Sequence, residues 1–239
     1  MIKTPFLETI LHSSLAFFFS RLYTTIAWLY DPVAWLSSMG QWRSWQRTVL
    51  TALPTGPTLE LGHGTGHMLL ALAERQASLV GIDPSKQMSR ITLRRLSHTS
   101  NQPGLARAKA QRLPFASGSF QAVFTTFPSE YIMDPASCSE VWRALQPGGK
   151  FIIIPGVAQI GGLPGWLSPI RLLDRLAAWL YRVTGQIEKD SSKPRNPLID
   201  ILKHEGFTVT QEHIELERAA IIRIICTKQG PIDPGSCST

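Results

Sequence analysis

The chain has 239 residues and a net charge of +7, a length that fits one large domain with an extension. Charged residues make up 17% and hydrophobic residues 44% of the chain, a balance that argues against an intrinsically disordered protein. The three cysteines lack the spacing of a zinc site or a disulfide framework. No secretory signal or membrane-spanning helix is expected, so the sequence predicts a cytoplasmic protein without a metal.

Residues 1–55 are expected to form a helical extension, and they contain ten of the 21 aromatic residues. Apolar residues from Leu7 to Leu29 recur at spacings of three and four, which predicts a helix over about 5–30. Asp31 and a following proline are typical of a helix start, so shorter helices are predicted over about 32–39 and 41–52. Three interpretations are open for the extension: a substrate lid, a peripheral anchor at the inner face of the membrane, or a helix packed on the sheet.

From residue 58 onward, strand and helix patterns alternate. Strands are predicted at Thr58–Leu61, Leu79–Ile82, Leu105–Ala108, Phe120–Phe127, Phe151–Ile154, Phe207–Leu216 and Ala219–Thr227. Helices are predicted at Thr65–Arg75, Ser85–Leu96, Pro135–Leu145 and Leu198–His204. Strands that are separated by helices of this length predict an α/β fold with a parallel sheet covered on both faces.

Two segments interrupt or follow this alternation. A glycine-rich irregular stretch, an amphipathic helix over Trp166–Val183 and a polar loop form an insertion over about 156–197. A turn is predicted at Pro147–Gly149, before the fifth strand. The last residues, 229–239, are expected to be a flexible tail.

Positive charge is concentrated in the middle of the chain. Between Pro84 and Ser129 there are no acidic residues and seven basic ones: Lys86, Arg90, Arg94, Arg95, Arg107, Lys109 and Arg112. A solvated helix face explains such a stretch, and an electropositive surface for RNA or phospholipid is the alternative.

A glycine loop lies between the first predicted strand and the next helix, in the sequence Leu-Glu-Leu-Gly-His-Gly-Thr-Gly-His of residues 59–67. Glycines in such a loop permit a tight turn and a close approach of the backbone to a ligand, and the helix that follows favours an anion. A dinucleotide fingerprint would place its third glycine at His67, and the Gly-Lys pair required by a P-loop is followed by Phe151. Both nucleotide motifs are therefore disfavoured.

Asp83 lies just past the second predicted strand, 17 residues after Gly66. Ligands of open parallel sheets bind at the carboxyl ends of the strands, where an aspartate can accept hydrogen bonds from both hydroxyls of a ribose. The alternative is that Asp83 or Ser85 caps the next helix. Together with the glycine loop, the ribose role is favoured.

In their order along the chain, these motifs resemble those of class I S-adenosylmethionine-dependent methyltransferases. The resemblance depends on Glu60–Gly66, Asp83, Leu113–Phe115, Ser119–Val123 and Leu145–Gly149. Within the class, the chain is similar to the ubiquinone/menaquinone C-methyltransferase branch, closely over about 57–155 and loosely over 198–228. The resemblance implies a Rossmann-like sheet of seven mostly parallel strands in a domain over 56–228, with S-adenosylmethionine as the cofactor.

The resemblance implies that the glycine loop binds the methionine part of the cofactor. Gly62, Gly64 and Gly66 would pass under this part, with Glu60 supporting the loop and His63 lying within it.

Further implied contacts lie on the ribose, the adenine and the sulfonium. Asp83 would bind the ribose, and Met88 would lie near the adenine. Ala110 would donate its backbone N–H to an adenine nitrogen with Gln111 beside it, and Phe127 would border the sulfonium.

Two positions depart from the family pattern. Lys109 stands where the family usually has an Asp or Asn that accepts a hydrogen bond from the adenine amino group, whereas a lysine only donates. Gln121 replaces the aspartate of a Ser-Phe-Asp motif, a change that we expect to be structural. Neither change removes the glycine loop or Asp83.

Methyl transfer from a sulfonium is an in-line displacement, for which an enzyme aligns the reactants and excludes water. An oxygen or carbon nucleophile can also require a general base. Candidates are Glu130 and Tyr131 near the end of the fourth strand, and His63 and His67 in the glycine loop. A surface carboxylate, a tyrosine at the edge of the core and locally hydrogen-bonded histidines are the alternatives.

The apolar extension and the insertion are expected to cover the substrate pocket, which favours methyl transfer to a hydrophobic or aromatic small molecule or a lipid-like acceptor. One alternative is an RNA methyltransferase that uses the basic stretch 86–112, although no added RNA-binding module is visible. A second is a non-catalytic S-adenosylmethionine-binding partner subunit, which Lys109 supports. The acceptor, the methylated atom and the oligomeric state are left open.

Overall fold

A computed structural model of the chain describes residues 30–38, 40–75, 78–160, 196–217 and 219–230. The helices predicted over about 5–30 and over Trp166–Val183 lie outside the described residues, as does the tail from residue 231.

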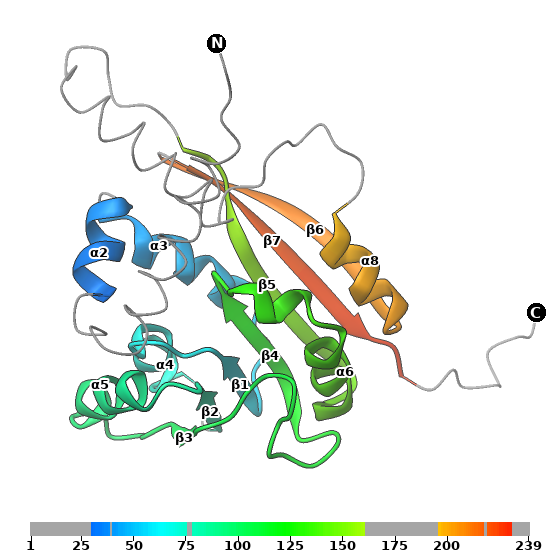
Figure 1. The fold of residues 1–239 in the computed structure, drawn as a ribbon, viewed down its shortest axis with the longest axis horizontal. Helices are drawn as coiled ribbons and strands as arrows, with labels where there is room; N and C mark the ends of the chain where they lie inside the picture. The colour runs from blue at the N-terminus through cyan, green and yellow to red at the C-terminus, as the bar shows by residue number, and fades with distance from the viewer. Residues whose placement is uncertain (1–29, 39, 76–77, 161–195, 218, 231–239) are drawn as a thin grey trace, which may run out of the picture.

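A sheet of seven strands forms the centre of the fold (Figure 1). In chain order the strands are β1 (Thr58–Leu61), β2 (Leu79–Ile82), β3 (Gly104–Ala106), β4 (Phe120–Thr126), β5 (Leu145–Ile160), β6 (Phe207–Leu216) and β7 (Ala219–Lys228). They are arranged in the order β3-β2-β1-β4-β5-β7-β6. The first five are parallel to one another, and β7 is antiparallel to β5 and β6. The expected α/β fold with seven mostly parallel strands is confirmed.

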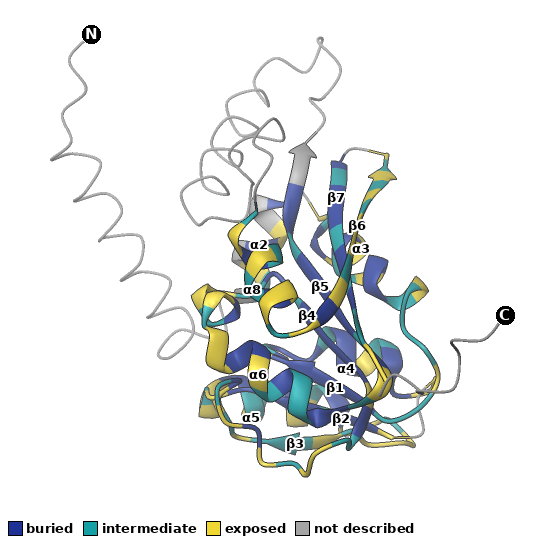
Figure 2. Cartoon of the chain, turned by 90° about the vertical axis from the view of Figure 1, so that its right-hand side faces the viewer, coloured by how far each residue is buried: buried dark blue, intermediate teal, exposed yellow. Residues whose placement is uncertain are grey.

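Helices cover both faces of this sheet. One face carries α3 (Trp42–Arg47), η2 (Thr48–Thr51), α4 (His67–Leu72) and α5 (Lys86–Leu96); the other carries α6 (Pro135–Ala144) and α8 (Pro197–His204). Consecutive residues of β5 alternate between the two layers: Phe151 and Ile153 pack in the cluster with α6 and α8, while Ile152 packs in the cluster with α3 and α4. Because apolar layers cover both faces, most residues of the central strands β1, β4 and β5 are buried (Figure 2).

Three helices begin at a polar cap that the sequence supplies. The Ser85 hydroxyl accepts a hydrogen bond from the Met88 N–H at the start of α5. Asp134 caps α6 and Asn196 caps α8, and in both helices a proline follows at the first helical positions. These are the start signals that fix the helix boundaries locally.

The described part of the N-terminal extension, α2 (Tyr30–Ser37) together with α3 and η2, is attached to the sheet. Trp42 and Trp45 are buried against the end of β4 and β5. From β7, Arg223 donates hydrogen bonds to the Thr48 carbonyl and the Thr51 hydroxyl, both at 2.6 Å. Residues 42–51 are therefore part of the packed core.

Most predicted boundaries agree with the structure to within two residues, and two predictions were wrong. Residues 156–160, predicted to be irregular, continue β5 in antiparallel pairing with β7, a partner that the local pattern does not reveal. The turn predicted at Pro147–Gly149 is confirmed near the start of β5: residues 146–149 are inserted between Leu145 and Lys150, which pair with Phe120 and Ala122 of β4, and Gly148 has a φ of 76°. The helix predicted from Thr65 to Arg75 spans only His67–Leu72, and it starts late because Gly66 before it has a left-handed backbone with a φ of 79°.

None of the helices in the described ranges combines the length and the apolar character needed to cross a membrane.

Candidate functional site

The glycine loop follows β1 at the carboxyl edge of the parallel strands. The Gly62 and His63 N–H groups both donate to the Ile82 carbonyl at the end of β2, at 2.8 and 3.1 Å. The Gly66 N–H then donates to the His63 carbonyl at 2.8 Å, which closes the turn. Because Gly62, Gly64 and Gly66 have φ values of 69°, 51° and 79°, the loop adopts a conformation that favours glycine at all three positions.

The three glycines differ in what surrounds them. A Cβ atom added at Gly66 would lie 2.5 Å from the Thr92 Cγ2 atom of α5, and one added at Gly62 would lie 3.1 Å from the Tyr131 hydroxyl. A Cβ atom at Gly64 would meet nothing within 4 Å. Glycine at positions 62 and 66 therefore lets the loop pack closely against Tyr131 and Thr92. At Gly64 the backbone faces open space that a ligand can occupy.

Asp83, directly after β2, is bound to this loop. Its Oδ2 atom accepts a hydrogen bond from the Gly64 N–H at 3.0 Å, and its Oδ1 atom accepts one from the Ser85 N–H at 2.8 Å. Burial raises the pKa of Asp83, while these two N–H groups and His63 act in the opposite direction. The helix cap is Ser85 rather than Asp83, and both oxygens of Asp83 keep a further lone pair for a ligand.

Glu60 lies within β1 beneath the loop and is only 2% exposed. Burial, and then the negative charge of Asp83, raise the pKa of Glu60 well above its ordinary range. Its Oε2 atom has no hydrogen-bond partner among the described residues. A buried polar atom without a partner is costly, so a ligand with a donor group at this edge would be stabilised.

His63 is buried between the loop, β2 and α5. Its Nδ1 atom lies 3.0 Å from the Gly64 carbonyl oxygen and 3.2 Å from the Thr92 hydroxyl. Its Nε2 atom is buried without a partner in the described part of the chain, and burial lowers the pKa of its ring. The ring therefore supports the Gly64 peptide.

The residues expected near the adenine come from α5 and from the loop after β3. Met88 and Ala110 are buried, and Gln111 is partly exposed. Lys109, the departure from the family pattern, is exposed. Because β3 is next to β2, this loop leaves the sheet at the same edge as Asp83.

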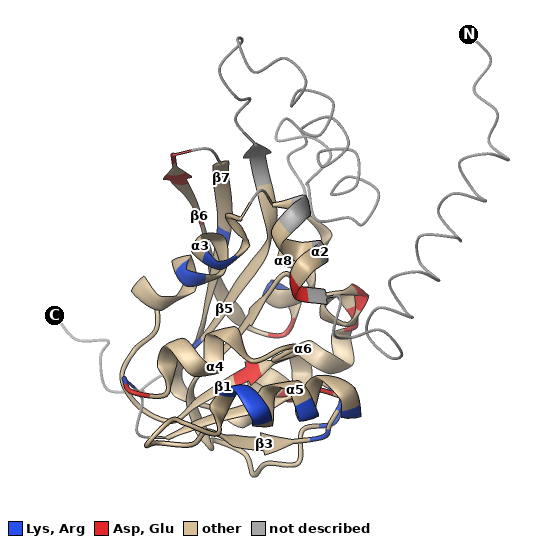
Figure 3. Ribbon diagram, turned by 90° about the vertical axis from the view of Figure 1, so that its left-hand side faces the viewer, with Lys and Arg blue, Asp and Glu red and all other residues tan. Residues whose placement is uncertain are grey.

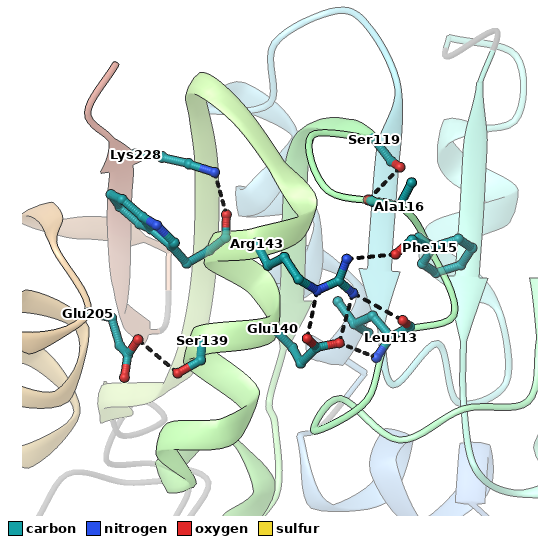
Figure 4. Close-up of polar contacts among 10 residues, drawn as sticks. Leu113, Phe115, Ala116, Ser119, Ser139, Glu140, Arg143, Glu205 and Lys228 are labelled. Carbon is teal, nitrogen blue, oxygen red and sulfur yellow. Dashed lines mark hydrogen bonds and ion pairs between the residues drawn. The ribbon is translucent and has the colours of Figure 1, made fainter. Parts of the chain in front are cut away.

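The same loop is fixed to α6 by an ion pair (Figure 4). Glu140 accepts a hydrogen bond from the Leu113 N–H at 2.7 Å and pairs with the Arg143 guanidinium, also at 2.7 Å. Arg143 in turn donates to the carbonyl oxygens of Leu113 and Phe115, at 3.2 and 2.8 Å. We call these contacts the α6 clamp.

Phe127 follows β4 and is stacked on Trp42 with ring centroids 4.3 Å apart. Its φ of 50° is rare for a residue other than glycine, and such backbone conformations concentrate at functional sites. The Phe127 N–H donates to the Ile154 carbonyl, which holds the ring at the end of the central strands.

The catalytic candidates Glu130 and Tyr131 lie in η3 (Glu130–Met133) and differ in their surroundings. The Tyr131 hydroxyl lies 2.7 Å from the Thr125 hydroxyl and donates to the Leu61 carbonyl at 3.2 Å, beside Gly62. Glu130 is exposed. The catalytic roles of Glu130 and Tyr131 stay predictions, and so do the expected contacts with the cofactor.

Sequence reasoning missed a second ion-pair network, which joins α2 to the glycine loop. Asp31 accepts hydrogen bonds from the Thr65 hydroxyl at 2.7 Å, the His67 Nε2–H at 3.0 Å and the Arg95 guanidinium at 2.6 Å. Arg95 also donates to the Thr65 carbonyl. Burial alone would raise the pKa of Asp31, but hydrogen bonds from His67, Thr65 and Arg95 outweigh it and hold the pKa well below its ordinary value. We call these contacts the Asp31 latch.

No group of three or more His, Cys, Asp or Glu side chains that could hold a metal ion is present in the part of the chain that the structure describes.

Comparison with known proteins identifies the family of this core. Residues 59–153 match the family model described as "Methyltransferase domain". These residues are a methyltransferase domain. The matched segment runs from β1 into β5 and so includes the glycine loop, Asp83 and the loop after β3.

Two curated relatives carry names from quinone biosynthesis. The chain is 30% identical over 142 residues to a ubiquinone/menaquinone biosynthesis C-methyltransferase of Geotalea daltonii, a match that covers 56% of the chain and 60% of the relative. It is 36% identical over 122 residues to a demethylmenaquinone methyltransferase of Beutenbergia cavernae, covering 48% of each. In both cases, less than two thirds of the relative is spanned.

The fold is shared with solved methyltransferase structures. A SAM-dependent methyltransferase of Thermotoga maritima is 20% identical with a TM-score of 0.56, and the match covers 84% of this chain and 94% of that one. At this identity, the likeness supports the Rossmann-like methyltransferase fold.

Proposed function

We propose that the protein transfers a methyl group from S-adenosylmethionine to an apolar, quinone-like acceptor. The methyltransferase domain supports the reaction class, and the names of the curated relatives support the acceptor class. The observation that carries the proposal is the open face of Gly64 in a loop that Asp83 holds from β2.

The residues at this edge fit the cofactor. The backbone at Gly64 offers a cradle that a side chain would fill, and Glu60 supplies a buried acceptor oxygen without a partner. Asp83 keeps lone pairs for the ribose, and Ala110 and Gln111 follow β3 at the same edge as Asp83. When bound, S-adenosylmethionine supplies a methyl group activated by a sulfonium.

The chain's own contribution is alignment and exclusion of water. Phe127, Trp42 and Trp45 form an aromatic wall at the end of β4, and their rings are buried. An apolar wall beside the reacting atoms favours an apolar acceptor and keeps water from competing for the methyl group. The left-handed backbone at Phe127 fixes the direction of its ring.

A carbon or oxygen acceptor also has to lose a proton. Tyr131 and Glu130 are the proposed candidates for receiving it, because both follow β4. The Tyr131 hydroxyl donates to the Leu61 carbonyl, so it would have to leave that carbonyl before it could act on an acceptor. Glu130 is exposed and carries no such constraint.

The cofactor loop is tested by placing a branched side chain on its open face. Gly64→Val should abolish binding of S-adenosylmethionine, since valine fills the cradle. Gly118→Val is the matched control: Gly118 has a φ of 67°, also has nothing within 4 Å of an added Cβ atom, and lies in the loop before β4. Both variants place valine on a left-handed backbone, at φ values of 51° and 67°. Calorimetric titration that finds wild-type affinity in folded Gly64→Val would remove this loop from the site.

The acceptor class is tested by transfer of labelled methyl groups into a cell extract. The extract is then separated into lipid, RNA and polar metabolites. Label in the lipid fraction supports a quinone-like acceptor. Label in RNA or in polar metabolites overturns this acceptor class while leaving the methyltransferase activity in place.

A further inference from the structure

Three helices on one face of the sheet form a continuous surface. Helix α3 packs beside α4, and α4 beside α5. Exposed basic residues lie on the two outer helices: Arg43 and Arg47 on α3, and Lys86, Arg90 and Arg94 on α5. Figure 3 shows basic positions on α3 and α5 on this side of the molecule. Of the described residues from 42 to 96, only Glu74 is both acidic and exposed.

The basic residues of α3 and those of α5 each form a row along their helix. Arg43 and Arg47 are four residues apart, and Lys86, Arg90 and Arg94 repeat the same interval, so each row follows one side of its helix. Like charges at this spacing destabilise a helix in the absence of a counter-charge. No ion pair joins any of the five to a carboxylate within the described ranges, whereas the neighbouring Arg95 is paired with Asp31.

A hollow between α3 and α4 adds a place for an anion. Arg43, Arg47 and His67 line this open hollow together with Leu70. Guanidinium groups bind phosphate oxygens through two parallel hydrogen bonds. Arg43 and Arg47 therefore place two guanidinium groups beside a hollow that an anionic head group can approach.

Large apolar side chains are exposed around the same cations. Trp35 of α2, Leu70 of α4 and Leu93 of α5 are 64%, 38% and 56% exposed. Trp35 and Arg43 together line a second, smaller hollow. Exposed leucines gain nothing from a polyanion such as RNA, but a bilayer interface buries them while basic side chains reach the phosphates.

We propose that this surface docks on a bilayer that contains anionic phospholipid. The basic face is defined as Arg43, Arg47, Lys86, Arg90 and Arg94 with Trp35, Leu70 and Leu93. The link from docking to methyl transfer rests on the proposed function, because an apolar acceptor is dissolved in the bilayer and docking brings the glycine loop to it. Binding to vesicles itself requires no methyl transfer.

The test is flotation of the full chain with vesicles of phosphatidylcholine, alone or mixed with phosphatidylglycerol. The protein should float with the anionic vesicles, and the bound fraction should fall as salt is added. Arg43→Gln with Arg47→Gln should weaken binding about 30-fold, which corresponds to ~1 kcal/mol for each charge near an anionic surface. Arg90→Gln with Arg94→Gln should give a similar loss.

The matched control removes two exposed charges elsewhere. Arg112→Gln with Lys203→Gln lowers the net charge equally, but neither residue lies on α3, α4 or α5. This variant should bind anionic vesicles as the wild type does. Equal binding by all three double variants, or binding that does not respond to salt, would overturn the proposal.

Two further measurements separate lipid from RNA and docking from catalysis. Leu93→Gln should weaken vesicle binding without changing the net charge. If a single-stranded RNA binds more tightly than the vesicles, and Leu93→Gln leaves that binding unchanged, the basic face binds RNA instead. Titration with S-adenosylmethionine should give wild-type affinity for all these variants. If the wild type does not bind S-adenosylmethionine, the proposed function is contradicted, but the vesicle-binding result is unaffected.

Discussion

The Asp31 latch and the α6 clamp each hold one loop of the candidate site, and they are built differently. The latch joins residues 34, 36 and 64 positions apart in the sequence, from three helices and the glycine loop. In the clamp, Glu140 and Arg143 are three residues apart on a single helix and bind the backbone of the loop after β3. The first network can form only when the whole layer has assembled, whereas the charged pair of the second exists as soon as α6 forms.

This difference predicts unequal consequences. Asp31 has three polar partners and is 29% exposed, so its removal leaves Arg95 without its counter-charge and His67 without its hydrogen-bond partner. Arg143 is bonded to a neighbour on its own helix and to two backbone carbonyls of a single loop. The glycine loop should therefore depend on the latch more than the loop after β3 depends on the clamp.

The largest effect is expected where a proposed contact residue itself is removed. Asp83→Ala should weaken binding of S-adenosylmethionine and of its demethylated product by a similar factor, because the ribose is common to both. Each hydrogen bond to a charged group contributes roughly 1.5–3 kcal/mol. Calorimetry with both ligands measures the loss. A lower melting temperature at unchanged affinity would show that Asp83 only fixes the Gly64 and Ser85 backbone.

The latch is tested by Asp31→Ala. We expect the free energy of unfolding to fall by about 2 kcal/mol, since hydrogen bonds to a charged acceptor are lost. Cofactor affinity should fall as well, because Thr65 lies in the glycine loop. Denaturant unfolding and calorimetry give the two values.

A second Asp-Pro pair supplies the control for Asp31. Asp134 precedes Pro135 at the start of α6 and caps that helix by accepting from the Ala136 N–H. Asp134→Ala should cost about 1 kcal/mol of stability as a lost cap, with cofactor affinity unchanged. If the two variants reduce affinity equally, the latch has no special relation to the loop.

These two networks also show what the sequence could and could not predict. The strands β1 and β2 were predicted to the residue, because each is a short apolar run beside turn residues. The glycine loop and Asp83 belong to local motifs and were found in the same way. The full length of β5 was not predicted, because residues 156–160 are strand only through their pairing with β7.

Asp31 was predicted only as the start of a helix. Nothing near it in the sequence points to Thr65, His67 or Arg95, which approach it only after α2, α4 and α5 have packed. Glu60 was expected to support the loop, but its partnerless oxygen depends on complete burial, which the sequence of β1 alone does not reveal. Local signals therefore predicted the motifs, and long-range packing decided their electrostatics.

A smaller effect is expected from the clamp. Arg143→Met should lower the free energy of unfolding by about 1 kcal/mol, because the ion pair is partly exposed. Affinity for S-adenosylmethionine should fall less than in Asp31→Ala. Ser139→Ala is the control on the same helix, since it removes only an exposed hydrogen bond to Glu205 (Figure 4). A larger affinity loss in Arg143→Met than in Asp31→Ala would reverse the order that the two networks predict.

The smallest effect is a difference in pH dependence between two carboxyl groups. The pKa of Asp31 is lowered in the folded protein, so its contribution to stability is present above its ordinary value of 3.8 and is lost as the pH falls below it. The pKa of Glu60 is raised, so the folded state binds the extra proton and stability is lost as the pH rises above 4.5. The free energy of unfolding of the cofactor-free protein is measured from pH 3 to pH 8 for the wild type, Asp31→Asn and Glu60→Gln. The difference between the wild type and Asp31→Asn should rise with pH, whereas the difference between the wild type and Glu60→Gln should fall. Slopes of the same sign would mean that Glu60 has a hydrogen-bond donor in solution, and the partnerless acceptor proposed for the cofactor would be lost.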